Sequence, residues 1–209
     1  MQKIMFNDKY DLTQTVLVGR KTQTRRMLNP TMIFKRLETY EGWLKENISA
    51  WKRSCKRRLY EAQENELQQM LDYALSSSRY KVGEVVAVAQ KYKDIALDMP
   101  VELAAELIKQ PGWNNNMFVK ADLMPHRVRI TNIRVERLQD ISEADSLKEG
   151  IWRGDNVGLE GTTYWYHGLA NSSFRTPQQA YASLIDSISG KGTWASNPYV
   201  FVYDFELIN

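Results

Sequence analysis

The fold of this chain is decided by one short basic stretch, Gly19-Arg20-Lys21-Thr22-Gln23-Thr24-Arg25-Arg26. Gly19 follows residues 11–17, whose pattern predicts a short helix, and a glycine there is typical of the left-handed residue that ends a helix. Residues 21–26 alternate and are β-prone, which predicts a strand. Side chains three apart in a strand point to opposite faces, so Lys21 and Thr24 can meet only if Lys21 still belongs to the turn.

Further strands and helices follow without the regular strand–helix–strand repeat of a parallel sheet. In residues 127–138, Val128 and Ile130 share one parity of the alternation whereas Ile133 and Val135 share the other, which indicates a β-bulge. Strands interrupted by helices favour an α+β fold, here a small, mostly antiparallel β-barrel with helical insertions. The other expected elements are strands at 4–6, 82–89 and 199–207, helices at 100–109, 142–149 and 177–188, and a loop rich in Gly, Trp and Tyr at 152–168.

Length and composition indicate one globular domain. The chain has 209 residues, of which 43% are hydrophobic and 25% charged, the ordinary balance of a protein with a packed core. No apolar run approaches the roughly 18 residues of a membrane span, and the N-terminus lacks the apolar stretch of a signal peptide. The single cysteine and the two histidines do not make a zinc set. We therefore expect a cytoplasmic protein without a metal or a cofactor.

The charge is unevenly distributed. Residues 1–58 hold 14 Lys and Arg against 5 Asp and Glu, although the formal net charge of the whole chain is only +3. From Pro30 to about Leu75, apolar residues recur at steps of three and four, which predicts a long helix or a helical hairpin. Its polar side could follow a phosphate backbone or could be an ordinary solvated helix face. The basic residues concerned are Lys52, Arg53, Lys56 and Arg57.

Known catalytic motifs for nucleotide binding and for serine hydrolysis are absent from the sequence. With two histidines, acid–base chemistry must fall on Lys, Glu, Asp, Thr or Tyr. A lysine activates a hydroxyl only as a neutral amine, and lowering its pKa to near 7 costs roughly 4–5 kcal/mol, which burial can supply. Lys21 beside Thr24 could therefore be a base and a nucleophile, or a basic turn that contacts phosphate or solvent. Glu149 ends its predicted helix, where the helix dipole disfavours a negative charge and suits a proton donor.

These residues resemble a family, the ASCH domains, which share the PUA-like barrel fold. Gly19-x-Lys21-x-x-Thr24-x-Arg26 is similar to the family's Gly-x-Lys-x-x-Thr-x-Arg signature, and three further segments match in order over roughly half of the chain. They are Val82-Gly83-Glu84-Val85, then Leu138-Gln139-Asp140-Ile141-Ser142 leading to Glu149, and the final strand Pro198-Tyr199-Val200-Phe201-Val202-Tyr203-Asp204-Phe205.

The resemblance implies an activity as well as a fold. In the small ASCH proteins that are 4-acetylcytidine amidohydrolases, the catalytic Lys, Thr and Glu fall on Lys21, Thr24 and Glu149 of this sequence. In that reading neutral Lys21 accepts a proton, Thr24 attacks the acetamide carbonyl and Glu149 protonates the leaving amine. Arg26 is then a candidate oxyanion donor, with Arg25 beside it as a further substrate-binding residue.

This chain is about twice as long as the compact amidohydrolases and looks like the longer ASCH proteins of bacteriophages and their hosts. We expect a single ASCH/PUA-like domain over 1–209, with insertions at about 30–79, 93–125 and 152–195. The aromatic residues Trp152, Tyr164 and Trp165 could stack on an exposed base or could pack the last insertion onto the barrel.

Three functions stay open at this point. The first is amide hydrolysis of an N-acylated cytidine-like base. The second is non-catalytic binding of RNA or a modified nucleotide, and the third is metal-independent cleavage of RNA, because relatives of this fold bind or cleave RNA. In each reading the partner is RNA or a modified nucleoside, with no membrane partner.

Overall fold

A computed structural model describes residues 1–28, 65, 68–69, 71–155, 161–168 and 173–208. The basic residues expected to follow a phosphate backbone, Lys52, Arg53, Lys56 and Arg57, lie outside the described residues, as does most of the expected insertion at 30–79.

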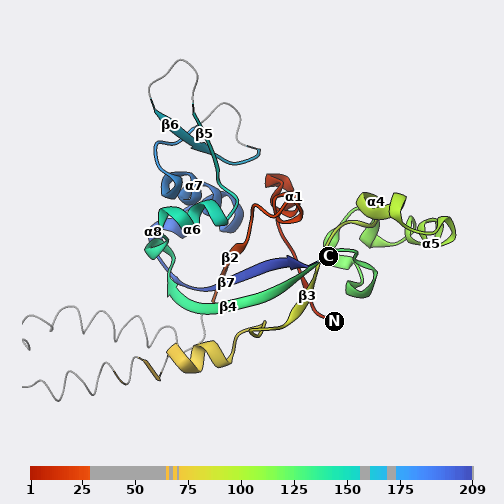
Figure 1. The fold of residues 1–209 in the computed structure, drawn as a ribbon, viewed down its shortest axis with the longest axis horizontal. Helices are drawn as coiled ribbons and strands as arrows, with labels where there is room; N and C mark the ends of the chain where they lie inside the picture. Colours follow the sequence, from red (N-terminus) through yellow and green to blue (C-terminus); the bar gives the residue numbers. More distant parts are fainter. Residues whose placement is uncertain (29–64, 66–67, 70, 156–160, 169–172, 209) are drawn as a thin grey trace, which may run out of the picture.

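A five-stranded, mostly antiparallel sheet organises the described residues (Figure 1). The two long strands β4 (Arg127–Arg137) and β7 (Tyr199–Ile208) pair antiparallel along their lengths and form its middle. β2 (Gln23–Met27) pairs with the other side of β7, and β3 (Val85–Val88) pairs with β4. β1 (Lys3–Ile4) adds to β3 as the one parallel pair of this sheet. The expected α+β fold is therefore confirmed.

The bulge expected in β4 is confirmed. The register between β4 and β7 shifts between Ile130 and Asn132, so Ile130 pairs with Phe205 while Asn132 already pairs with Asp204. The extra residue moves the inward-facing parity, as the sequence pattern indicated, and increases the local twist.

Closure into a barrel is not observed in the described part of the chain. The strand order β1-β3-β4-β7-β2 leaves β1 and β2 at the two edges of the sheet. A side chain bridges these edges, because the Arg26 guanidinium on β2 donates a hydrogen bond to the Met5 carbonyl just after β1. Phe6 and Phe205 also contact each other across this curved face, with ring centroids 5.7 Å apart.

Four helices lie together over one side of the sheet (Figure 1). They are α1 (Leu12–Leu17), α6 (Glu143–Lys148), α7 (Pro177–Ser189) and α8 (Thr193–Ser196), and short 3₁₀ helices at Asp8–Tyr10 and Leu138–Asp140 lead into α1 and α6. The buried face of α7 packs Ala180, Tyr181 and Leu184 into the main core, which strands β3, β4 and β7 complete from below.

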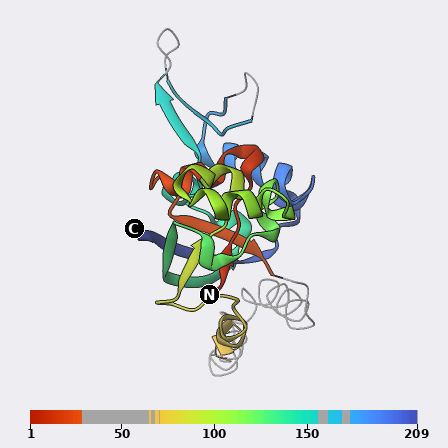
Figure 2. The same cartoon turned by 90° about the vertical axis from the view of Figure 1, so that its right-hand side faces the viewer.

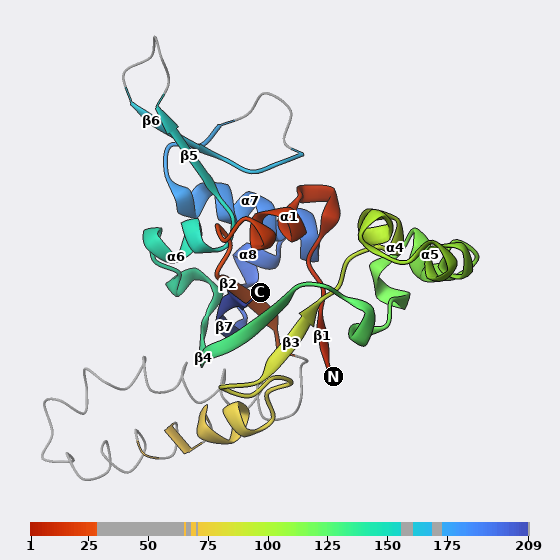
Figure 3. The same cartoon turned by 45° about the vertical axis from the view of Figure 1, so that its right-hand side comes forward.

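The segment between β3 and β4 forms a lobe beside the sheet (Figure 3). It has its own apolar cluster, to which Tyr92, Ile95 and Leu107 contribute. Its elements are α4 (Tyr92–Ile95), α5 (Val101–Leu107) and 3₁₀ helices at Ala96–Asp98, Pro111–Trp113, Asn116–Phe118 and Ala121–Leu123.

The prediction of a loop at 152–168 is wrong in part, because this segment contains a β-hairpin. β5 (Trp152–Asp155) pairs antiparallel with β6 (Thr162–Trp165) in a separate two-stranded sheet. The hairpin projects away from the helices, as Figure 2 shows. β-prone Thr, Tyr and Trp residues outweigh the glycines here because each strand supplies a partner for the other.

None of the described helices combines the length and the hydropathy that crossing a membrane requires.

Candidate active site

The site forms where the connection between α1 and β2 meets the C-terminal end of α6. Gly19 has φ 72°, the left-handed conformation expected of a residue that ends a helix. The chain then turns back, because the backbone N–H of Lys21 donates to the Thr15 carbonyl at 2.9 Å. The next N–H, that of Thr22, donates to the Lys148 carbonyl at 3.0 Å, which fixes the start of β2 beside the end of α6.

Glu149 is the residue that closes α6. The Ser142 hydroxyl caps the start of this helix by accepting from the Asp145 N–H, and the Glu149 N–H completes its last turn on the Asp145 carbonyl at 3.0 Å. Gly150 follows with φ 102°, where a Cβ would lie 3.2 Å from Leu12 Cδ2. The positive φ therefore favours glycine, and the approach of Leu12 from α1 leaves little room for a Cβ beside Glu149.

Lys21 and Glu149 form a buried ion pair. The Lys21 Nζ lies 2.6 Å from Glu149 Oε2 and also donates to the Glu149 carbonyl at 2.7 Å. The two side chains are 2% and 5% exposed. Lys21 precedes β2, so it lies in the turn, which is the condition under which it can share a face with Thr24.

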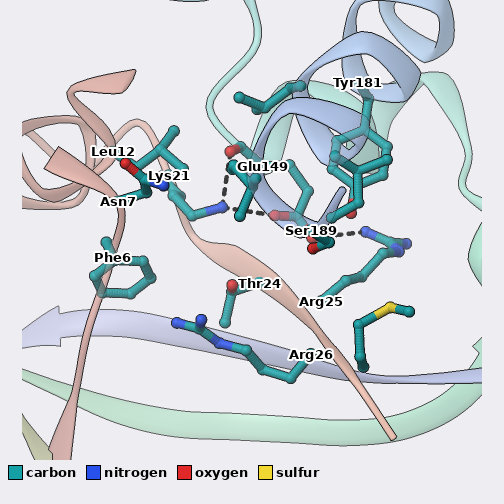
Figure 4. A pocket seen from close by; sticks show the side chains of 14 residues that line it. Phe6, Asn7, Leu12, Lys21, Thr24, Arg25, Arg26, Glu149, Tyr181 and Ser189 are labelled. Atoms are coloured by element: carbon teal, nitrogen blue, oxygen red, sulfur yellow. Dashed lines mark hydrogen bonds and ion pairs between the residues drawn. The ribbon is translucent and has the colours of Figure 1, made fainter. Parts of the chain in front are cut away.

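Thr24 lies on the same cavity as this pair. Its side chain is buried and, within the described residues, its hydroxyl has no hydrogen-bond partner. Figure 4 shows Thr24 on β2 facing the space beside the Lys21 ammonium and the Glu149 carboxylate. The structure therefore brings together the three side chains that the sequence singled out: an amine, a hydroxyl and a carboxyl.

Arg25 supports Glu149 from the other side. Its Nη1 lies 3.1 Å from Glu149 Oε1, while its Nε donates to Glu136 Oε1 at 3.1 Å. A second arginine, Arg134, extends this network of ion pairs across β4, and the buried Gln23 amide bridges it to the last strand. The other members are Asp145, which lies 3.6 Å from Arg25, and Asp204, which accepts from both Arg134 and Gln23.

This network shares the positive charge of Arg25 among several acids. Glu136 and Asp145 compete with Glu149 for its guanidinium, so Arg25 holds the Glu149 carboxylate in place without being neutralised by it alone. Lys148, the residue before Glu149, pairs with Asp145 at 3.3 Å.

A cavity of about 170 Å³ opens in front of the triad. A closed apolar cavity of about 150 Å³ can hold benzene, so this volume suits one six-membered ring. Phe6, Leu12, Leu184 and Ile185 supply apolar walls around the charged end. Three exposed residues, Met27 at the end of β2 and Ile188 and Ser189 at the end of α7, mark its mouth.

Burial changes the acid–base character of Lys21. It lowers the pKa of the Lys21 ammonium below 10.5, because the buried site disfavours the charged form. Glu149 opposes this shift, and the neighbouring Arg26 and Arg25 guanidinium groups add to it. The pKa of Lys21 therefore moves in the direction that a general base requires.

Arg26 also lines the cavity, but its guanidinium is already engaged. It donates to the Met5 carbonyl and lies over the Phe6 ring, 5.7 Å from the ring centroid. Its role as an oxyanion donor, expected from the sequence, is therefore less favoured by the geometry than a role in joining the edges of the sheet.

The aromatic residues expected to bind a base do not line this cavity. Trp152 lies in the hairpin, with the Arg20 guanidinium 3.5 Å from its ring centroid and His167 against its edge. The Trp165 indole covers Gly154, whose Cβ would lie 2.4 Å from Trp165 Cη2. Tyr164 forms a bridge with Phe174 and packs on the main core. The packing alternative that the sequence left open therefore describes them.

Tyr181 is the cavity residue that sequence reasoning missed. It is 2% exposed on the buried face of α7, and its hydroxyl is enclosed without a partner in the described part of the chain. The sequence predicted a helix at 177–188 without singling out this position, where the one available signal was a polar atom on an otherwise apolar helix face.

Among the described residues, no group of three or more His, Cys, Asp and Glu side chains is arranged to hold a metal ion. Comparison of the chain with protein-family models, curated proteins and solved structures found no match. The site is therefore interpreted from its own geometry and from the residues that resemble the ASCH signature.

Proposed function

We propose that this chain is an ASCH-type amidohydrolase that removes the acyl group from an N-acylated pyrimidine nucleoside such as 4-acetylcytidine, on a sheet related to the PUA-like barrel. The observation that carries the proposal is the convergence of Lys21, Thr24 and Glu149 on one ring-sized cavity. Lys21 and Glu149 are 128 positions apart in the sequence, so local packing does not explain their meeting.

The Lys21–Glu149 pair can supply both a base and an acid. A single proton shift along their 2.6 Å hydrogen bond converts ammonium and carboxylate into a neutral amine and a carboxylic acid. Burial lowers the pKa of Lys21 and so favours its neutral amine. The amine then takes the Thr24 proton while the Thr24 oxygen bonds to the acyl carbon. The Glu149 acid protonates the departing amine nitrogen as the C–N bond breaks, which leaves an acyl ester on Thr24 and the ionised pair.

Hydrolysis of the ester restores the starting state. The Glu149 carboxylate accepts a proton from water, and the water oxygen bonds to the acyl carbon. The Thr24 oxygen leaves and takes a proton from the Lys21 ammonium. The net reaction consumes one water and releases the free amine and a carboxylic acid, so protons and charges balance over the cycle.

The shape of the cavity supports a small substrate. Its volume of about 170 Å³ accommodates one ring with its acyl substituent and little more. Its apolar walls suit the faces of a pyrimidine, and the charged end lies where an exocyclic amide would reach Thr24. A nucleoside or a single exposed nucleotide fits these dimensions better than a duplex.

The proposal is tested by incubating the purified protein with 4-acetylcytidine and measuring cytidine release. We expect turnover by the native chain, retained turnover in Thr24→Ser, and loss in Thr24→Val, because only Ser keeps the nucleophilic oxygen. Thr22→Val is the matched control, since Thr22 lies two residues away and does not line the cavity. Absence of cytidine release by the native chain, or equal turnover in Thr24→Val, contradicts the proposal.

A further inference from the structure

Tyr181 lines the cavity, and its buried hydroxyl is unsatisfied. The side chain is 2% exposed, and its oxygen is enclosed without a hydrogen-bond partner in the described part of the chain. Leaving a buried donor unpaired costs about 1–3 kcal/mol, so an unpaired group of this kind calls for an explanation.

Other buried tyrosines of the described residues satisfy their hydroxyls within the protein. Tyr166, which packs on the same helix, lies 2.9 Å from the Ser183 hydroxyl. Further examples are Tyr10 on the Ser187 carbonyl, Tyr80 on the Lys3 carbonyl, Tyr92 with the Lys120 N–H, and Tyr203 with the Ser78 hydroxyl. Tyr181, which lines the cavity, differs from these tyrosines because its hydroxyl has no partner among the described residues.

The ring of Tyr181 is held firmly in place. Trp194 packs against it edge-on with the ring centroids 6.2 Å apart, and the Arg25 guanidinium lies 5.8 Å from its centroid. Figure 4 shows the ring descending from α7 on the side of the cavity where the Glu149 carboxylate and Arg25 also lie. A donor fixed in this way needs little reorganisation when a ligand enters.

The hydroxyl stays protonated over the range in which an enzyme would work. Burial raises the pKa of the Tyr181 hydroxyl well above 10, and the nearby Glu149 carboxylate adds to the shift. The group is therefore a hydrogen-bond donor and does not act as a base.

The other donors at the charged end are already committed. Lys21 donates to the Glu149 carboxylate and carbonyl, Arg25 to Glu136, Gln23 and Glu149, and Arg26 to the Met5 carbonyl. Among the described buried residues that line the cavity, the hydroxyls of Thr24 and Tyr181 are uncommitted. Asn7 and Ser189 also line the cavity but are less buried, so if Thr24 is the nucleophile, Tyr181 is the buried donor that remains among the described cavity residues.

We propose that Tyr181 is a further catalytic residue, whose hydroxyl donates a hydrogen bond to the carbonyl oxygen of the substrate amide. This inference rests on the proposed function. When the Thr24 oxygen bonds to the acyl carbon, an electron pair moves to the carbonyl oxygen, and the Tyr181 hydrogen bond strengthens as that oxygen becomes negative. No proton is transferred from Tyr181, so the proton balance between Lys21 and Glu149 is unchanged.

Tyr181→Phe tests this role because it removes one oxygen and keeps the ring. Loss of a single oxyanion donor lowers kcat by about 100- to 1,000-fold, and we expect a fall of that size with KM nearly unchanged. We expect the melting temperature to stay the same or rise, since the deleted hydroxyl has no partner to lose. Tyr181→Phe should therefore lower kcat without lowering the melting temperature.

Tyr166→Phe is the matched control. It removes a hydroxyl bonded to Ser183 outside the cavity lining, so we expect a lower melting temperature and an unchanged kcat. Replacement of Tyr181 by 3-fluorotyrosine, a stronger donor of nearly equal size, should restore kcat to at least the native value. Native kcat in Tyr181→Phe overturns the role of Tyr181 and leaves the proposed function standing. Absence of both turnover and binding of 4-acetylcytidine in the native chain overturns both.

Discussion

The Lys21 ammonium lies 2.6 Å from the Glu149 carboxylate, and both side chains are almost completely buried. The pair is asymmetric, because Lys21 has Glu149 as its only ion-pair partner among the described residues whereas Glu149 also contacts Arg25 at 3.1 Å. Removing Glu149 therefore leaves a buried ammonium without an ion-pair partner, whereas removing Lys21 leaves Glu149 paired with Arg25. The two substitutions should therefore change the free energy of unfolding by different amounts, which can be measured without knowing the substrate.

Glu149→Gln should destabilise the protein more than Lys21→Met. The first change strands a buried ammonium and should cost about 3–5 kcal/mol at neutral pH. The second leaves Glu149 paired with Arg25 and should cost about 1–2 kcal/mol, mainly through lost hydrogen bonds. Urea unfolding of both variants measures the difference, and equal losses would contradict the asymmetric arrangement.

The stability of Glu149→Gln should rise with pH. Without the carboxylate that opposes it, burial holds the pKa of Lys21 below the unfolded value near 10.5. Between the folded and the unfolded pKa the unfolded chain binds more protons, so the free energy of unfolding increases with pH over this window. The double variant Lys21→Met/Glu149→Gln should lose this slope, and a slope that persists in the double variant assigns it to another group.

The turnover of 4-acetylcytidine should decrease with pH through a midpoint below 10.5. Both catalytic groups depend on the single proton that Lys21 and Glu149 share, and burial lowers the pKa of Lys21, so the pair loses this proton at a lower pH than an exposed lysine would. Lys21→Arg keeps the charge beside Glu149 but cannot lose its proton, so we expect it to be inactive across the whole profile. A Lys21→Arg enzyme with the native pH profile would falsify the role of Lys21 as base.

Local signals in the sequence predicted the elements that hold the site. These signals are the glycine after residues 11–17, the parity switch in 127–138 and Ser142 before α6. Each depends only on a few neighbouring residues, and the structure has each feature. The meeting of Lys21, Thr24 and Glu149 could be anticipated only through the resemblance to the ASCH signature. Composition and spacing alone left open whether Lys21 is a base beside Thr24 or part of a basic turn that contacts phosphate or solvent.

The partners around the site could not be read from the sequence, because they are contributed by distant strands. Arg25 meets Glu136 only after β2 and β4 have both paired with β7. The same holds for Tyr181, whose environment depends on the packing of α7 over β2. The choice between stacking and packing for Trp152 stayed open in the sequence for a related reason, since Arg20 covers its ring from the turn before β2.

Gly150→Ala should reduce both stability and turnover. An L-residue at φ 102° is strained, and its Cβ would lie 3.2 Å from Leu12 Cδ2 and 3.4 Å from Thr15 Oγ1. We expect a loss of about 1–3 kcal/mol in the free energy of unfolding. Turnover of 4-acetylcytidine should fall further, because Glu149 is the adjacent residue and a shift of about 1 Å can cost 100-fold in rate.

Gly83→Ala is the control for Gly150→Ala, because it introduces the same kind of backbone strain without the crowding found at Gly150. Gly83 has φ 83° and no atom within 4 Å of its added Cβ, so it carries the conformational cost alone. We expect a smaller loss of stability there and an unchanged kcat. Equal losses of kcat at the two glycines would show that the contact of Gly150 with α1 does not position Glu149.

Trp165→Ala and Trp152→Ala should leave the turnover of 4-acetylcytidine within about twofold of the native rate. Both indoles lie on the hairpin, outside the cavity lining. Trp165 covers Gly154 within the hairpin, and Trp152 packs on Arg20 from the turn before β2. The matched contrast is Phe6→Ala, which removes an apolar wall of the cavity and should raise KM severalfold because substrate contact is lost. Steady-state kinetics on the three variants show whether the substrate contacts the cavity wall at Phe6 or the hairpin indoles. A large rise in KM for either tryptophan variant would mean that the hairpin closes over the substrate, which would restore the base-stacking role that the sequence suggested.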